Sequence, residues 1–292
     1  MTSEELIKKV GRIELATRGA VNNLFAGEYH AAFKGRGMSF AEVREYQEGD
    51  DVRDIDWNVT ARLNKPYIKV FEEERELTVM LMVDISGSLD FGTGRCIQRE
   101  LVAELAATLA FSATRNKDKV GLVLFSDHIE KFIPPQKGRK HVLRLISELL
   151  EYQPTSRKTD IGESIVFLMK AMKRRCISFL ISDFMDTKDF NDSLLLASKK
   201  HDVVALQVYD KRMAELPSVG LLKVCDAETG HEQYVDTSSK KVRDEHARWW
   251  QERINELDRM FNKSKVDYVR VCAEDDYVSA LKTLFSKRVR FA

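Results

Sequence analysis

Residues 79–88 read VMLMVDISGS, an apolar run that ends in a carboxylate and two hydroxyls. Apolar residues are nearly continuous from Leu77 to Ile85, which is typical of a strand buried on both faces. Such strands belong to parallel sheets, where ligands bind beyond the carboxyl ends of the strands. This stretch therefore predicts an α/β protein with a candidate site directly after the strand.

The chain downstream alternates between strand-like and helical patterns. We expect further strands at 119–125, 176–182, 203–209 and 268–272, with 129–133 as the hairpin partner of the first of these. Helical spacing occurs at 96–116, 140–152, 160–173, 190–200, 240–262 and 277–286, and a short hairpin is predicted within 219–236. This order favours a Rossmann-like, mostly parallel sheet with helices on both faces.

The first 76 residues differ in character from the rest. A helix is predicted over 3–25, an irregular segment over 29–64 and a strand over 67–74. We therefore divide the chain into an N-terminal extension, 1–76, and a main domain, 77–292. With so little regular structure the extension would make a poor independent core, so we expect it to pack on the main domain.

Composition excludes several classes of protein. The 292 residues include 47 Lys and Arg against 46 Asp and Glu, so electrostatic attraction to nucleic acid is not expected. The N-terminus MTSEELIKKV has no apolar core of a signal peptide, and no apolar run is long enough to span a bilayer. The four cysteines show no metal-type spacing, which favours a reduced, cytoplasmic protein.

The site after the central strand begins with Asp84, Ser86 and Ser88. Asp and Ser are also ordinary turn residues, so a simple strand-to-helix turn is the alternative. A carboxylate and two hydroxyls that converge above the sheet are hard oxygen donors, which suit Mg²⁺, Mn²⁺ or Ca²⁺. The motif therefore predicts part of a divalent-cation site.

Other loops must supply the remaining oxygens. Thr159 directly precedes a predicted helix start, and Asp183 directly follows the buried run 177–182. Asp186 and Asp189 are nearby alternatives to Asp183, which we favour because it stands at the carboxyl end of the strand.

These five residues resemble the metal-ion-dependent adhesion site of von Willebrand factor type A domains. In that family DxSxS is followed by a Thr from a second loop and an Asp from a third, which match Asp84, Ser86, Ser88, Thr159 and Asp183. The resemblance implies that these residues bind Mg²⁺, or Mn²⁺ or Ca²⁺. It also implies that the sixth coordination position is left for an acidic side chain of a partner protein.

A second resemblance involves residues 46–58, which read YQEGDDVRDIDWN and are followed by Ala61 and Arg62. This segment is similar to the signature of the bacterial domain-of-unknown-function family fifty-eight, which pairs it with a downstream type A-like domain. The resemblance implies a partner or adaptor of a MoxR-type AAA+ ATPase, in the cytoplasm or peripheral to the inner membrane through partners.

Two interpretations of the signature segment are open: a second cation or docking site, or a structural network. We favour the network, because paired carboxylates and guanidiniums can fix an irregular segment. In it, Arg44, Arg53 and Arg62 would pair with Asp51, Asp54 and Asp56, and Trp57 would anchor the loop in the core. The signature residues assigned to the network are Asp50, Asp51, Arg53, Asp56, Trp57 and Arg62.

Two functions from different classes remain. The first is a non-enzymatic, cation-dependent protein-binding module. The second is a Mg²⁺-dependent phosphatase or hydrolase that uses Asp84 as nucleophile. Against the enzyme, Ser86 stands where a haloacid-dehalogenase-type phosphatase needs its second Asp, and no GxSxG or Walker motif is present.

Overall fold

The structure is a computed structural model that describes residues 10–14, 17, 39–47, 50–63, 65–72, 76–90 and 98–291. The chain forms two compact units, Met1–Ala32 together with Leu77–Ala292, and Phe33–Glu76. Residues 10–14 and 17 are helical, and the rest of the helix expected over 3–25 lies outside the described ranges. The packing of residues 1–76 on the main domain stays a prediction.

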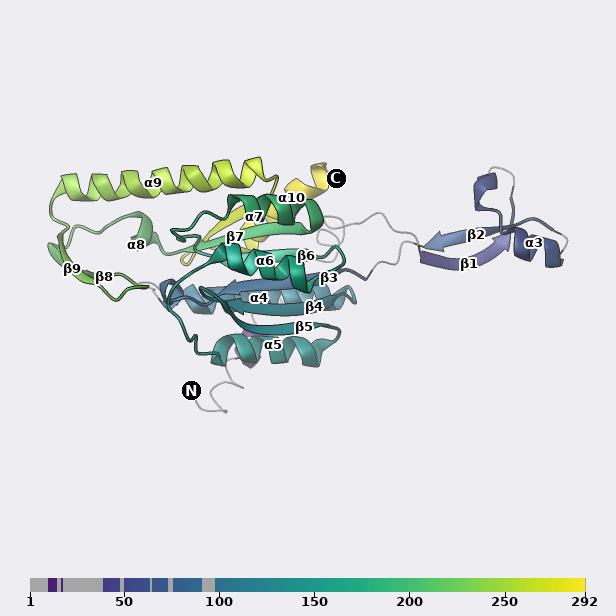
Figure 1. Ribbon diagram of the computed structural model, residues 1–292, viewed down its shortest axis with the longest axis horizontal. Coiled ribbons are helices and arrows are strands. Elements are labelled where there is room, and N and C mark those ends of the chain that lie inside the picture. The colour runs from purple at the N-terminus through teal and green to yellow at the C-terminus, as the bar shows by residue number, and fades with distance from the viewer. Residues whose placement is uncertain are drawn as a thin grey trace. The chain divides into compact units, whose positions relative to one another are not determined.

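The larger unit is built on a six-stranded sheet of order β10-β7-β6-β3-β4-β5 (Figure 1). Its strands are β3 (Thr78–Asp84), β4 (Lys119–Phe125), β5 (Ile129–Gln136), β6 (Ile177–Ser182), β7 (Asp202–Tyr209) and β10 (Asp267–Cys272). All neighbouring strands are parallel except β5, which pairs with β4 as an antiparallel hairpin. The predicted α/β class and the mostly parallel sheet are confirmed.

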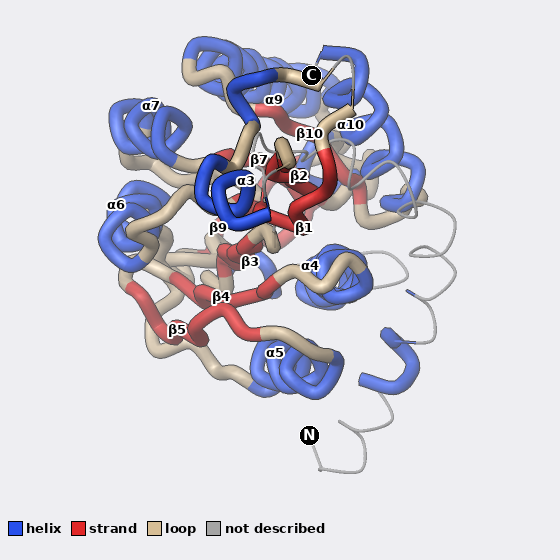
Figure 2. Tube along the Cα trace, turned by 90° about the vertical axis from the view of Figure 1, so that its right-hand side faces the viewer, coloured by secondary structure: helices blue, strands red, loops and turns tan. Residues whose placement is uncertain are grey.

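Helices cover both faces of this sheet (Figure 2). On one face lie α4 (Gln98–Arg115), α5 (Arg139–Glu151) and α10 (Tyr277–Phe291), and on the other lie α6 (Ile161–Ala171), α7 (Asn191–Lys200) and α9 (Lys240–Lys263). Met80 and Met82 of β3 join the core cluster of α6, α7 and α9, whereas Leu81 lies with Ala106 of α4 and Leu145 of α5. The apolar run of β3 is continuous because successive side chains enter opposite cores, where each contributes about 1.5–3 kcal/mol.

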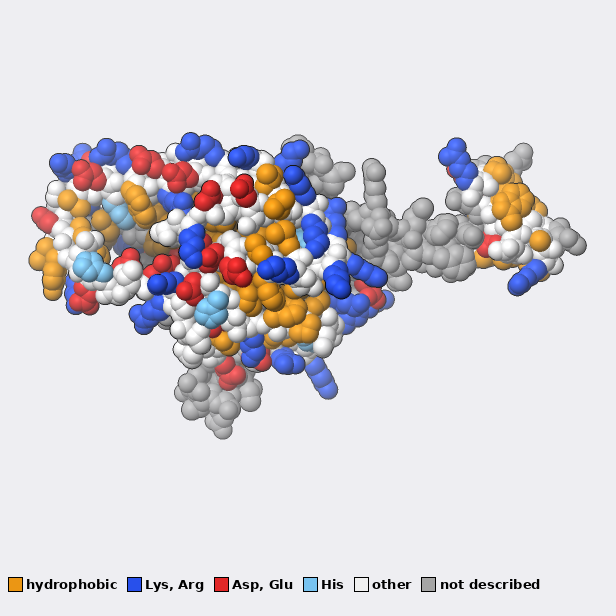
Figure 3. Space-filling model, in the orientation of Figure 1, with side chains coloured by type: hydrophobic (Ala, Val, Ile, Leu, Met, Phe, Trp, Pro, Cys, Tyr) orange, Lys and Arg blue, Asp and Glu red, His pale blue; other side chains and the backbone are white. Residues whose placement is uncertain are grey.

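The chain between β7 and β10 adds a hairpin and two helices to this unit. Helix α8 (Lys211–Ala214) is followed by the antiparallel strands β8 (Leu221–Cys225) and β9 (Glu232–Asp236), as predicted for 219–236. In α9, Trp250, Ile254, Leu257 and Phe261 are buried, while Trp249 is 52% exposed. The outward face of α9 carries acidic and basic side chains in mixture (Figure 3). None of the helices in the described ranges is long and apolar enough to cross a bilayer.

The smaller unit contains two antiparallel strands, β1 (Ser39–Glu45) and β2 (Tyr67–Glu72). Between them lie the 3₁₀ helix η1 (Val52–Asp54) and the helix α3 (Trp57–Leu63). Regular structure therefore extends into the range 29–64, where the sequence indicated an irregular segment. These elements are short, so they carry too few residues for a periodic pattern to show.

Candidate functional site

Three loops meet at the carboxyl edge of the sheet, because β3 lies between β4 and β6. Asp84 is the last residue of β3, Ser126 directly follows β4, and Asp183 directly follows β6. Asp84 is in register with the last residue of β4. The edge is the one that faces the β8–β9 hairpin (Figure 1). The fold thus places the two acidic residues of the predicted site at one edge of the sheet.

The turn after β3 is held by hydrogen bonds among its own polar side chains. The backbone N–H of Ser86 donates to Asp84 Oδ1 over 2.8 Å, and the hydroxyls of Ser86 and Ser88 lie 3.0 Å apart. Ser182, at the end of β6, donates its hydroxyl to Asp84 Oδ2 over 2.7 Å. The side chains of Asp84 and Ser86 are buried. The three residues of the motif therefore lie together, and both oxygens of Asp84 are engaged.

Asp183 has one engaged and one unengaged oxygen. Its Oδ1 accepts the backbone N–H of Met185 over 3.0 Å, and its carbonyl accepts the side-chain amide of Gln207 over 3.0 Å. Its Oδ2 is buried and has no hydrogen-bond partner among the residues that the structure describes. Since a buried carboxylate oxygen without a partner is costly, this atom points to a ligand.

Thr159 is buried in a short segment that is fixed to both neighbouring loops. The backbone N–H of Asp160 donates to the carbonyl of Ser126 over 3.0 Å, and that of Ile161 donates to Asp186 Oδ2 over 2.8 Å. The loop after β4 and the loop after β6 therefore hold the residues on the C-terminal side of Thr159 in place.

The two alternatives to Asp183 have other partners. Both oxygens of Asp186 accept backbone N–H groups, one at the start of α6 and one in its own loop. Asp189 Oδ1 accepts the backbone and side-chain N–H groups of Asn191 at the start of α7. Asp186 thus positions the segment that carries Thr159, a role that the sequence alone did not indicate.

The electrostatics of the site favour a bound cation. Burial, and then the charge of Asp183, raises the pKa of Asp84, and burial, with the charge of Glu228 added, raises the pKa of Asp183. Within the described ranges neither carboxylate forms an ion pair with Lys or Arg. Two buried carboxylates at one edge thus lack a Lys or Arg that would neutralise them. A proton or a metal ion could neutralise this charge instead.

The donor set fits a hard divalent cation. Two carboxylates and three hydroxyls from three loops are the oxygen ligands that Mg²⁺, Mn²⁺ and Ca²⁺ prefer. The described residues contain no group of three His, Cys, Asp or Glu side chains arranged for a metal. The two carboxylates would therefore need the hydroxyls of the neighbouring loops to complete a ligand set.

A cavity of about 680 Å³ opens beside the site and is lined by Ser88 and Asp183. The β8–β9 hairpin forms part of its wall through residues 225–228. The hairpin approaches the motif closely, since a Cβ on Gly87 would lie 2.5 Å from the carbonyl oxygen of Ala227. The site therefore has an open side, and the hairpin borders it.

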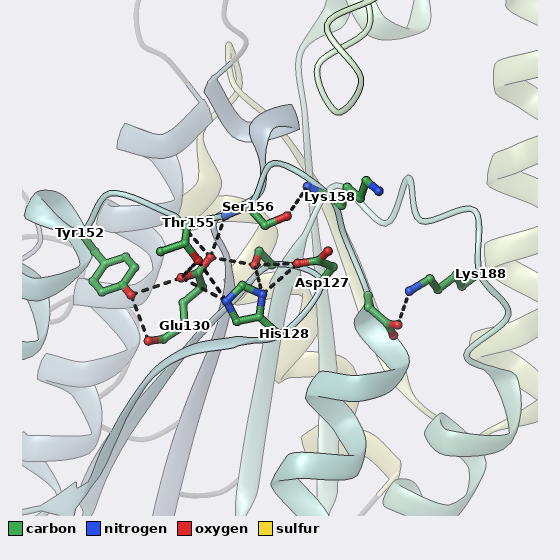
Figure 4. A network of polar contacts seen from close by, with 10 residues as sticks. Asp127, His128, Glu130, Tyr152, Thr155, Ser156, Lys158 and Lys188 are labelled. Carbon is green, nitrogen blue, oxygen red and sulfur yellow. Dashed lines mark hydrogen bonds and ion pairs between the residues drawn. The ribbon is translucent and has the colours of Figure 1, made fainter.

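A polar network at the end of β4 fixes the loop that leads to Thr159 (Figure 4). Glu130 accepts the hydroxyl of Ser126 over 2.8 Å, the hydroxyl of Thr155 over 2.8 Å and the hydroxyl of Tyr152 over 3.2 Å. Burial would raise the pKa of Glu130, but these and two backbone hydrogen bonds together lower it. His128 also contacts this network, and its hydrogen bond to Asp127 raises its pKa.

The signature segment lies in the smaller unit. Arg44 forms a bidentate pair with Asp50, at 2.8 and 2.7 Å. The pairs expected with Asp51, Asp54 and Asp56 stay predictions. Asp51 and Asp56 also cap η1 and α3 through backbone N–H groups. The carboxylates thus mainly fix local helix starts.

Trp57 is 68% exposed, so the smaller unit does not itself bury it. It is the first residue of the seven-residue α3, which contacts β2. The role of Trp57 as a core anchor stays a prediction. Arg53 and Arg62 are also exposed, and the side chain of Asp54 lies outside the described part of the chain.

Comparison with known proteins gives a family match. The sequence profile of the family described as "Protein of unknown function DUF58" matches residues 42–255. The uncharacterized protein Rv1480 of Mycobacterium tuberculosis is 33% identical over 241 residues, which cover 81% of this chain and 75% of that protein.

Solved structures also show similarity. The conserved hypothetical protein BatB from Bacteroides thetaiotaomicron is 20% identical, covers 73% of this chain and 99% of its own, and has a TM-score of 0.49. The VWA domain of SpRpn10 is 9% identical, covers 73% of this chain and 95% of its own, and has a TM-score of 0.39.

Proposed function

The chain belongs to the DUF58 family, and from that premise we propose that it is a non-enzymatic, divalent-cation-dependent protein-binding module. In this function Asp84, Ser86, Ser88, Thr159 and Asp183 hold Mg²⁺, or Mn²⁺ or Ca²⁺. The coordination position on the open side of the site takes a carboxylate from a partner protein.

One observation carries the proposal: two buried carboxylates share one edge of the sheet without a basic partner, and Oδ2 of Asp183 is unengaged. A divalent cation would satisfy that oxygen and offset both charges. Because the other three ligands are neutral hydroxyls, which donate weakly, the ion stays electrophilic, and a further carboxylate can complete its coordination. Affinity for an acidic partner would then depend on the metal.

The partner class comes from the family resemblance of the signature segment. We propose a MoxR-type AAA+ ATPase, for which this protein acts as partner or adaptor in protein assembly or maturation. The interaction would take place in the cytoplasm or at the inner membrane through partners.

The alternative function, a phosphatase with Asp84 as nucleophile, is disfavoured by the geometry of that residue. Its two oxygens accept hydrogen bonds from Ser86 and Ser182, and its side chain is fully buried. A nucleophilic carboxylate needs an oxygen that can reach the phosphorus atom. A phosphatase screen with Mg²⁺ tests this alternative, and turnover that is lost in Asp84→Asn would favour it.

The proposed function is tested by measuring the binding of a purified MoxR-type AAA+ ATPase from the same organism by biolayer interferometry. We expect binding in millimolar Mg²⁺, loss in EDTA, and a roughly 10- to 100-fold loss for Asp84→Ala. Asp189→Ala is the matched control, because it removes a neighbouring carboxylate that accepts hydrogen bonds from Asn191 at the start of α7. A folded Asp84→Ala variant that binds as tightly as the wild type would overturn the proposal.

A further inference from the structure

The β8–β9 hairpin lies directly against the Asp84–Ser88 turn. Gly87 has no room for a side chain, since a Cβ there would lie 2.5 Å from the backbone oxygen of Ala227. Gly87 also donates its N–H to the carbonyl of Arg157 over 3.0 Å, so its backbone is fixed on one side. The residue after Ala227 in the hairpin is Glu228, and it lines the same cavity as Ser88 and Asp183.

The cavity beside the site is strongly acidic. Among the residues that the structure describes, its lining includes one basic residue, Arg253, and five acidic ones, which are Asp183, Asp186, Asp226, Glu228 and Glu256. Such an excess of negative charge would repel the carboxylate of an approaching partner unless a cation is present. The acidic residues differ, however, in how far their oxygens are already engaged.

Most of these carboxylates have partners within the chain. Asp186 accepts two backbone N–H groups, and Asp226 Oδ1 accepts two backbone N–H groups of its own turn. Glu256 pairs with Arg253 over 3.4 Å. The carboxylate of Glu228 has no hydrogen bond or ion pair in the part of the chain that the structure describes.

Glu228 and Asp183 line the same cavity. Thus an unengaged, half-buried carboxylate on the hairpin faces the same cavity as the unengaged, buried Oδ2 of Asp183. A divalent cation between the two carboxylates would neutralise their charge and give each a ligand contact.

We infer that Glu228 is an internal ligand of the cation. As the structure stands, its carboxylate is not grouped with those of Asp84 and Asp183 for a metal, so its side chain turns into the open coordination position when the ion binds and leaves it when a partner carboxylate displaces it. The inference rests on the proposed function and adds regulation to it. The hairpin would act as a competitor built into the chain, so only an acidic partner that binds more strongly than Glu228 would engage the metal. Glu228 is therefore a specificity residue as well as a ligand.

The first test compares Mn²⁺ binding by EPR for the wild type, Glu228→Gln and Glu256→Gln. Both variants remove one negative charge from the same cavity, so ordinary electrostatics affects both, whereas ligation affects only the first. We expect roughly tenfold weaker Mn²⁺ binding for Glu228→Gln than for Glu256→Gln. Water-proton relaxation should show about one additional exchanging water on Mn²⁺ in Glu228→Gln, since Mn²⁺ keeps its octahedral coordination.

The second test uses acetate as the carboxylate probe. With Mn²⁺ bound, acetate should displace the additional water in Glu228→Gln. This change in water-proton relaxation should need a lower acetate concentration than any such change in the wild type or in Glu256→Gln. Equal Mn²⁺ affinity and equal hydration in the two variants would overturn the role of Glu228 and leave the proposed function intact. A wild type that binds no Mn²⁺ at millimolar concentration would overturn both.

Discussion

Replacing Asp183 by Asn should stabilise the metal-free protein at alkaline pH, although it removes a proposed ligand. Asn retains the acceptor for the backbone N–H of Met185 and replaces the oxygen that has no partner. It also removes the charge that, after burial, raises the pKa of Asp84. The variant thus separates the cost of two buried charges from the loss of a hydrogen bond.

The size of the effect follows from the pKa of Asp84. Burial and the charge of Asp183 raise this pKa from 3.8 to about 7. The shift corresponds to about 4 kcal/mol of folding free energy that is lost when Asp84 is ionised. Because the folded pKa is the higher one, the associated stability is present below the unfolded pKa and is lost as pH rises through about 7. Because burial is the larger cause, Asp183→Asn should recover less than half of it, at most roughly 2 kcal/mol at pH 8.

The assay is urea denaturation followed by tryptophan fluorescence, in EDTA and in excess Mg²⁺. In EDTA the gain of Asp183→Asn should shrink as pH falls toward about 4, where both carboxylates are protonated in the folded protein and about half protonated in the unfolded chain. In Mg²⁺ at about 100 times its Kd the wild type should gain about 2.7 kcal/mol and the variant much less. A variant no more stable than the wild type at pH 8 in EDTA would refute the reasoning.

Three further substitutions test the supporting contacts. Gly87→Ala forces the hairpin, at Ala227, away from the Asp84–Ser88 turn, and should cost about 1–3 kcal/mol of unfolding free energy and weaken Mn²⁺ binding. Unchanged values in both measurements would contradict the close approach. Ser182→Ala leaves Asp84 Oδ2 and the backbone N–H of Phe184 without this partner and should lower the free energy of unfolding in urea by about 1–3 kcal/mol. Ser178→Ala is the control, because it removes a buried hydroxyl that has no partner among the described residues, and it should be near neutral. Glu130→Gln should cost about 1–3 kcal/mol at neutral pH, and because the pKa of Glu130 is lowered, the difference should diminish as pH falls below about 4.

The sheet and its helices could be predicted because they carry strong periodic patterns. Strand β3 is an unbroken apolar run, and α9 has an apolar stripe on an otherwise charged helix. Strand β1 and helix α3 could not be predicted this way, because they are short and the side chains described in them are half or fully exposed. A local signal for α3 existed, since Asp56 accepts the backbone N–H groups of its first turn.

The candidate site was predictable only in part. Residues that directly follow buried strands, such as Asp84 and Asp183, are indicated by position alone. Ser182 is the last residue of β6, directly before Asp183, and could have been included in the predicted site for that reason. Glu228 comes from a hairpin distant in sequence, and its place beside Asp183 depends on how that hairpin packs on Gly87. No local pattern in the sequence predicts such a contact between distant segments.

The most direct test of the cation site is Mn²⁺ binding by EPR, compared among the wild type, Asp84→Ala and Asp189→Ala, with Mn²⁺ raised to millimolar concentration. We expect one bound ion in the wild type and in Asp189→Ala, and none in a folded Asp84→Ala variant. A wild type without bound Mn²⁺ at that concentration, or an Asp84→Ala variant that binds as the wild type does, would contradict the cation site.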